Sequence, residues 1–151
     1  MSDEINTNQS TIDQLNELLS SYQIYYQNLR GYHWNIIGKK FFELHLKFEE
    51  YYNDVQLKID EIAERILGLA ATPLHSFPQY LEKSSLSVQE NITDGNVAIE
   101  QIKTQLEQLV TKQKDIIKTA DSNDDISTND LMTRYIAEQE KTLWMLRSYL
   151  S

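Results

Sequence analysis

Residues 41–69 carry the longest uninterrupted repeating pattern in this chain. Apolar side chains recur there every three or four residues, and no Gly or Pro occurs before Gly68. This period predicts one α-helix, which at ~1.5 Å per residue is about 43 Å long. Helices of that length are typical of helix bundles. Its apolar stripe comprises Phe41, Phe48, Tyr52, Val55, Ile59, Ile62, Ile66 and Leu69.

The same pattern predicts three more long helices, in keeping with only four Gly and two Pro in 151 residues. The first is expected to begin at a capping box of Ser10 and Asp13 and to end near Gly38. The third is expected over 97–120, with Ser87 as an alternative start. The fourth is expected over 128–150.

Both prolines lie in a long polar connection, "AATPLHSFPQYLEKSSLSVQENITDGN". We expect a short helix within it, over 78–83. A connection of this length crosses the bundle and makes the two helices it joins parallel. The sequence therefore predicts an all-α fold with one four-helix domain over 1–151, of which residues 1–10 are a short acidic N-terminal extension.

Composition excludes several classes of chemistry. The absence of Cys rules out disulfides and iron–sulfur clusters, so a metal ion would be held by His, Asp and Glu, which suit iron, manganese or zinc. The net charge of −9 opposes direct binding to nucleic acid and favours cations. No apolar run reaches the roughly 20 residues of a membrane span, and the polar N-terminus is unlike a signal peptide, so we expect a cytoplasmic protein.

Two of the three histidines flank the break at Gly38. His33 precedes the break by about as many residues as His45 follows it. If the two helices pack antiparallel across this short turn, the imidazoles lie at one level. His75 lies in the crossover connection and receives no role.

Three carboxylates follow on the second helix. With 100° per residue and His45 at zero, Glu49 falls at about 40°, Asp60 at about 60° and Glu64 at about 100°. They form a polar row beside the apolar stripe. However, His45 and Asp60 are about 22 Å apart along the axis, far beyond the ~2.0–2.2 Å of a metal–ligand bond.

A second copy would close that gap. If two such helices pack antiparallel about a twofold axis near Asp54 and Val55, His45 and Glu49 of one copy face Asp60 and Glu64 of the other, twice over. The alternative is purely structural. In that case the histidines are hydrogen-bonded core residues, and the acidic row is a solvated face balanced by Lys58 and Arg65.

The stretch from His33 to Leu69 resembles the Dps family, the DNA-binding proteins from starved cells, which are miniferritins. The similarity runs through H-W-N, F-F-x-L-H-x-K-F-E and D-E-I-A-E-R-I and continues to "STNDLM" and "LWMLRSYL" in the last helix. Many relatives have Asp where this chain has Glu49. No Glu-x-x-His motif occurs, which argues against a ferritin centre inside one bundle.

The resemblance implies a ferritin-like bundle that assembles as a hollow dodecamer of twofold dimers. Such a cage would oxidise Fe(II) with hydrogen peroxide or oxygen, store ferric mineral and protect against oxidative stress, with zinc or manganese as competing metals. The implied ligands are His33, His45 and Glu49 from one subunit and Asp60 and Glu64 from its mate.

Further roles come from the same resemblance. It implies that Trp34, beside the site, traps oxidising radicals; packing at an interface is the alternative. It also implies that Asp121, Asp125 and Asp130 line an iron-entry pore, with the closest match at Asp121 and Asp130. The alternative is a solvated loop with an Asp at a helix N-terminus.

DNA binding does not follow from the family name. Relatives that bind DNA use Lys- and Arg-rich tails, whereas no Lys or Arg precedes Arg30, and Asp3 and Glu4 lie near the N-terminus. We therefore expect no direct DNA binding. Two rival functions remain: a DNA-compacting protein with little catalysis, and a non-catalytic structural bundle.

Overall fold

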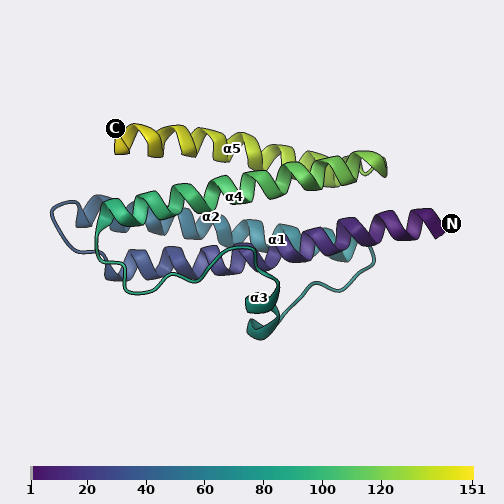
Figure 1. Cartoon of the computed structure of the whole chain (residues 1–151), viewed down its shortest axis with the longest axis horizontal. Helices are drawn as coiled ribbons and strands as arrows, with labels where there is room; N and C mark the ends of the chain where they lie inside the picture. The colour runs from purple at the N-terminus through teal and green to yellow at the C-terminus, as the bar shows by residue number, and fades with distance from the viewer. Residues whose placement is uncertain (1) are drawn as a thin grey trace.

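Four long helices form a bundle in the computed structural model, which describes the backbone of residues 2–151 and the side chains of residues 8–151 (Figure 1). Helices α1 (Ser2–Asn35) and α2 (Phe41–Gly68) make one antiparallel hairpin, and α4 (Gly95–Ser122) and α5 (Ile126–Leu150) make another. The two hairpins pack against each other chiefly through α1 and α4. The all-α prediction is confirmed. Within the described residues, no helix has an apolar stretch long enough to cross a membrane.

The first helix begins earlier than the sequence predicts. Ser10 lies inside α1, so the expected capping box is wrong. No Gly or Pro stands before it to end a helix, and Asp13 accepts a hydrogen bond from Gln9 Nε2 at 2.8 Å, one turn back. The side chains of Asp3 and Glu4, on which the acidic extension depends, lie outside the described residues.

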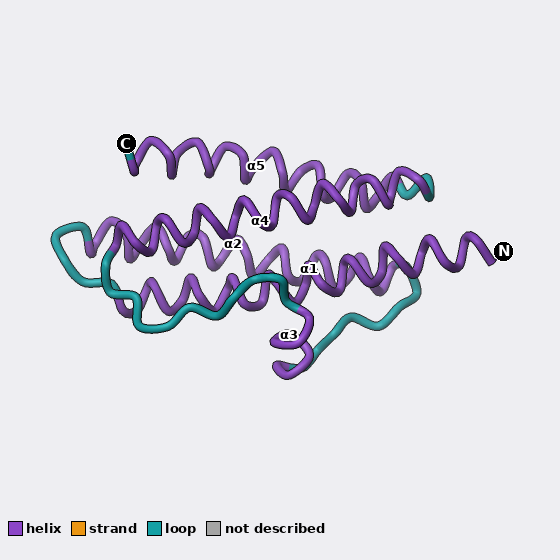
Figure 2. Tube along the Cα trace, viewed as in Figure 1, coloured by secondary structure: helices purple, strands orange, loops and turns teal. Residues whose placement is uncertain are grey.

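The crossover runs along the bundle and carries α3 (Phe77–Lys83) between two loop segments (Figure 2). The Ser76 hydroxyl caps α3 by accepting from the Gln79 backbone N–H, and the side-chain oxygen of Gln79 accepts from the Ser76 backbone N–H. Because the crossover passes from one end of the bundle to the other, α2 and α4 are parallel, as predicted (Figure 1).

The starts of α4 and α5 are set by aspartate caps. Asp94 accepts hydrogen bonds from the backbone of Asn96 and Val97, so α4 begins at Gly95, and the alternative start at Ser87 is wrong. Asp125 likewise accepts from the backbone N–H of Thr128, and α5 begins at Ile126. Capping, rather than the apolar pattern, decides both boundaries.

The turn between α1 and α2 is tied to the start of α4. Gly38 takes a positive φ of 121°, which suits glycine, and Ile37 N–H donates to the carbonyl of Thr93 at 2.9 Å. Gly95 approaches α2 so closely that an added Cβ would lie 2.5 Å from Leu44 Cδ1. These contacts fix the end of the bundle that carries both histidines.

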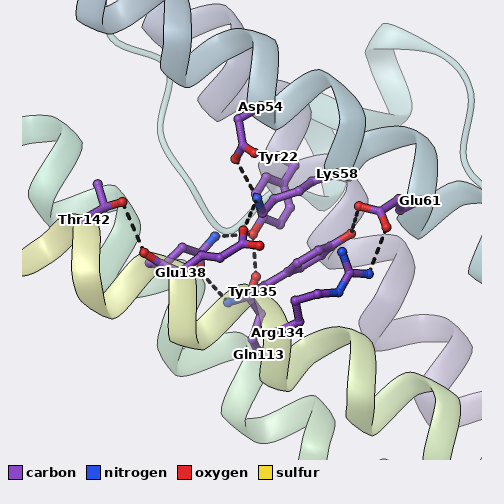
Figure 3. A network of polar contacts seen from close by, with 10 residues as sticks. Tyr22, Asp54, Lys58, Glu61, Gln113, Arg134, Tyr135, Glu138 and Thr142 are labelled. Carbon is purple, nitrogen blue, oxygen red and sulfur yellow. Dashed lines mark hydrogen bonds and ion pairs between the residues drawn. The ribbon is translucent and has the colours of Figure 1, made fainter.

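A closed ring of hydrogen bonds crosses the centre of the bundle. Tyr22 hydroxyl donates to Gln113 Oε1 at 2.5 Å, Gln113 Nε2 donates to Gln139 Oε1 at 2.7 Å, and Gln139 Nε2 donates back to the hydroxyl at 2.6 Å. All three side chains are buried. Tyr135 packs edge-on against Tyr22 and donates to Glu61, beside Lys58 (Figure 3). The ring therefore joins α1, α4 and α5 through polar groups that satisfy one another.

Candidate metal centre

The two histidines meet at the closed end of the α1–α2 hairpin. His33 occupies the last turn of α1 and His45 the second turn of α2. Their rings are stacked, with centroids 3.8 Å apart and an interplanar angle of 8°. His33 is buried and His45 is partly exposed. The expectation that the imidazoles lie at one level is confirmed.

Each histidine is hydrogen-bonded to the other's backbone. His33 Nδ1 lies 2.6 Å from the carbonyl of His45, and His45 Nδ1 lies 2.7 Å from the carbonyl of His33. A carbonyl oxygen only accepts, so the proton of each neutral ring sits on Nδ1. Nε2 of each ring then keeps its lone pair, which is the arrangement found in metal-binding histidines.

Aromatic rings hold the pair in place. Phe41 stacks on His45 with centroids 4.8 Å apart, and Tyr52 meets His33 edge-on at 5.3 Å. Partly buried rings on both sides restrict rotation of the imidazoles. The pair is therefore preorganised by the protein alone.

A single chain does not bring all the predicted ligands together. Glu49 follows His45 by one turn of α2 and is partly exposed, whereas Asp60 and Glu64 are exposed further along the helix. In the part of the chain whose side chains are described, no three His, Asp or Glu residues are grouped closely enough to hold a metal ion.

The structural alternative assigned Lys58 and Arg65 to the acidic row, and both side chains have other partners. Lys58 is buried and pairs with Asp54 at 2.6 Å and Glu138 at 2.8 Å (Figure 3). Arg65 pairs with Asp125 at 3.1 Å. Among residues 8–151, no ion pair involves the predicted ligands Glu49, Asp60 and Glu64.

The exposed face of α2 is also apolar. Large hydrophobic side chains stand along the same side of the helix as the acidic row, each more than half exposed: Phe42, Leu46, Leu57 and Leu67. An exposed apolar stripe of this kind marks an interaction surface. The acidic row of Glu49, Asp60 and Glu64 lies on the same side of α2 as these apolar side chains.

Sequence reasoning missed a groove between α1 and the crossover. A hollow of about 700 Å³ lies between α1, α3 and the loop over residues 88–92. Trp34 lines it at 55% exposure, with the Arg30 guanidinium 4.7 Å from its ring, and Phe77 and Leu81 of α3 line the other side. The exposed apolar residues of α3 could have indicated this groove, but whether they line it depends on the path of the crossover.

The aspartates of the α4–α5 turn differ in their surroundings. Asp125 is engaged locally, because its oxygens accept from Arg65 and from the backbone and hydroxyl of Thr128. Asp121 accepts a hydrogen bond from Asn129. Asp130 is exposed and lines a surface hollow of about 400 Å³ together with Glu61, Glu64, Arg65 and Arg134. His75 is exposed, with Nδ1 3.0 Å from the carbonyl of Pro73.

Comparison with protein families places residues 12–151 in the ferritin-like domain family. Two similar proteins are a DNA protection during starvation protein of Porphyromonas gingivalis and DNA protection during starvation protein 2 of Bacillus anthracis. The first is 38% identical over 89% of this chain and 85% of its own, and the second is 35% identical over 95% and 99%.

Solved structures show the same likeness. The crystal structure of a Dps protein from Vibrio cholerae O1 superposes with a TM-score of 0.95 at 47% identity, covering 97% of this chain and 92% of that one. That protein is described as a member of a broad superfamily of ferritin-like diiron-carboxylate proteins. A Dps protein from Bacillus brevis gives 0.94 at 30% identity, over 97% and 98% of the two chains.

Proposed function

Because this chain belongs to the Dps family of ferritin-like proteins, we propose that it oxidises Fe(II) at sites shared between two subunits and stores the ferric product in a hollow cage. The stacked pair of His33 and His45 carries this proposal. Their Nδ1 atoms are both used by backbone carbonyls, which leaves two nitrogen ligands at one edge of the subunit.

Pairing two copies through α2 supplies the missing carboxylates. With the helices antiparallel and the axis between Asp54 and Val55, His45 lies opposite the partner's Glu64, and Glu49 lies opposite the partner's Asp60. The same register sets Phe42 at the level of the partner's Leu67. The pairing thus buries the exposed apolar side chains of α2 while it completes two equivalent sites.

The ligand set suits the proposed substrate. Neutral imidazole and carboxylate bind Fe(II), and negatively charged oxygen ligands favour Fe(III) once it forms. Two Fe(II) ions give one electron each, and hydrogen peroxide takes both electrons and two protons to become two water molecules. Because the electrons are delivered as a pair, hydroxyl radical is not released. Oxygen is the alternative oxidant.

Iron entry is proposed to involve the acidic α4–α5 turn. Asp130 of α5 shares a hollow with Glu61 and Glu64, and also with Arg65 and Arg134, while Asp121 is exposed in the last turn of α4. The proposal is that these exposed carboxylates attract cations. Asp125 was expected to line the same pore, but its carboxylate instead caps α5 and pairs with Arg65.

DNA is proposed not to be a direct ligand, since the charge of −9 per subunit repels phosphates. A gel shift at neutral pH without magnesium should show free DNA. A stable complex would contradict this part of the proposal.

The first test is ferroxidase activity, with Fe(II) loaded anaerobically, peroxide added and ferric absorbance recorded. We expect fast oxidation by the native protein, loss in Asp60→Ala, and no change in Asp115→Ala, the same substitution at an exposed position on α4. Equal slow rates in all three proteins would overturn the proposal.

A second test asks whether the site is shared. His45→Ala and Asp60→Ala subunits are coexpressed in equal amounts. Each variant alone lacks a ligand in every site, but a mixed pair has one intact site, so about a quarter of all sites should recover. No recovery above the separate variants would place the ligands within one chain.

A further inference from the structure

Tyr52 contacts two of the proposed ligands at once. It lies on α2 one turn after Glu49, and its hydroxyl donates to Glu49 Oε1 at 3.3 Å. The edge of its ring meets His33 at 5.3 Å with an interplanar angle of 80°. No other tyrosine in the part of the chain whose side chains are described makes both contacts.

The ring of Tyr52 is itself fixed. Tyr26 on α1 packs edge-on against it, with centroids 5.8 Å apart and an angle of 89°. The Arg30 guanidinium lies 5.4 Å from the centre of the Tyr26 ring. Two helices therefore hold the phenol, so its hydroxyl is directed by packing and not by the free rotation of an exposed side chain.

The hydroxyl acts as a donor. The carboxylate oxygen of Glu49 only accepts, so the Tyr52 hydroxyl is the donor in this contact. Glu49 can then accept at Oε1 and keep Oε2 for another partner.

We propose that Tyr52 is a positioning residue, which aims the flexible Glu49 carboxylate and braces the His33 ring so that both ligands face one metal ion. Glu has a longer side chain than Asp and loses more rotational freedom when fixed, so a carboxylate anchored in advance binds more tightly. This inference rests on the proposed function.

The proposed pairing adds to this role. In the register centred between Asp54 and Val55, the partner's Leu57 lies at the level of Tyr52. An apolar side chain there excludes water from the phenol and strengthens its hydrogen bond to Glu49. Hydrogen bonds at such sites are commonly long before the ligand is bound, and they shorten in the complex.

The test uses Co(II) as a probe on the assembled protein, with affinity from calorimetry and geometry from the visible absorption of the bound ion. Tyr52→Phe removes the hydroxyl and keeps the ring. We expect its Co(II) affinity to fall by roughly tenfold, the lower end of the effect of outer-shell partners, with an altered spectrum and a raised KM for Fe(II). Tyr149→Phe, which removes an exposed hydroxyl bonded to Asn96, is the matched control and should leave the Co(II) affinity, the spectrum and the KM unchanged.

A double-mutant cycle isolates the contact. In a Glu49→Ala background, Tyr52→Phe should have no further effect on Co(II) affinity, because the hydroxyl has lost its acceptor. Additive losses would show that Tyr52 acts elsewhere and would overturn the inference, as would native affinity and spectrum in Tyr52→Phe.

Asp60→Ala separates this inference from the proposed function. If Asp60→Ala binds Co(II) as the native protein does, the shared site itself is wrong. If Asp60→Ala loses Co(II) while Tyr52→Phe keeps it, the site stands and the positioning role alone fails.

Discussion

Replacing Tyr22 with Phe tests whether the hydrogen-bonded ring at the bundle centre stabilises the fold. The substitution keeps the aromatic ring and creates no cavity, but it leaves Gln113 Oε1 without its donor and Gln139 Nε2 without its acceptor. Both amides are buried. A buried group left unsatisfied costs about 1–3 kcal/mol, and loss of the buried hydroxyl returns part of that, so we expect a free energy of unfolding lower by about 2–4 kcal/mol.

Thermal unfolding at one fixed subunit concentration is the assay, because assembly makes Tm depend on concentration. For a chain of this length 1 kcal/mol corresponds to about 3 °C, so Tm should fall by roughly 6–12 °C. Tyr149→Phe, which removes one exposed hydrogen bond, should cost less than about 0.5 kcal/mol. Equal shifts in the two variants would refute the claim that the ring is worth more than a surface contact.

Two further predictions concern association and alkaline pH. Leu57→Glu should weaken subunit association by at least about 30-fold in sedimentation experiments. The reason is that the proposed pairing buries two copies of this side chain, which is 67% exposed in the single chain. Unchanged assembly would exclude α2 as the contact. Burial raises the pKa of Tyr32 to about 12, only partly offset by its hydrogen bond with Gln105, so the unfolded chain loses this proton near pH 10 while the folded chain keeps it. The free energy of unfolding should therefore fall between pH 10 and 12, less steeply in Tyr32→Phe, as urea titrations at successive pH values would show.

Local patterns in the sequence predict the helices and the histidine pair well. The 3.6-residue period predicts α2 to within a residue, since nothing in that stretch competes with the helix. The shared level of His33 and His45 follows from their similar distances from Gly38 and from the short turn, and both features are visible in the sequence. The start of α1 could not be predicted in this way, because Ser10 is a good cap only if the preceding residues are not helical.

Contacts between helices were not predictable in the same way. Lys58 and Arg65 lie close in sequence to the acidic row, yet their charged ends reach Glu138 and Asp125 on other segments. Their choice of partner depends on how α2 is rotated in the bundle, which the linear pattern does not specify. The groove under Trp34 depends in the same way on the path of the crossover.

The closed ring at the bundle centre bears on how the rate of iron oxidation depends on protein concentration. Tyr22, Gln113 and Gln139 use their polar groups on one another there, and the proposed metal chemistry lies instead on an outer face and needs two chains. By mass action, the rate of iron oxidation per chain would then rise with protein concentration until pairing is complete. The abundance of the protein would thus set the threshold at which iron oxidation begins.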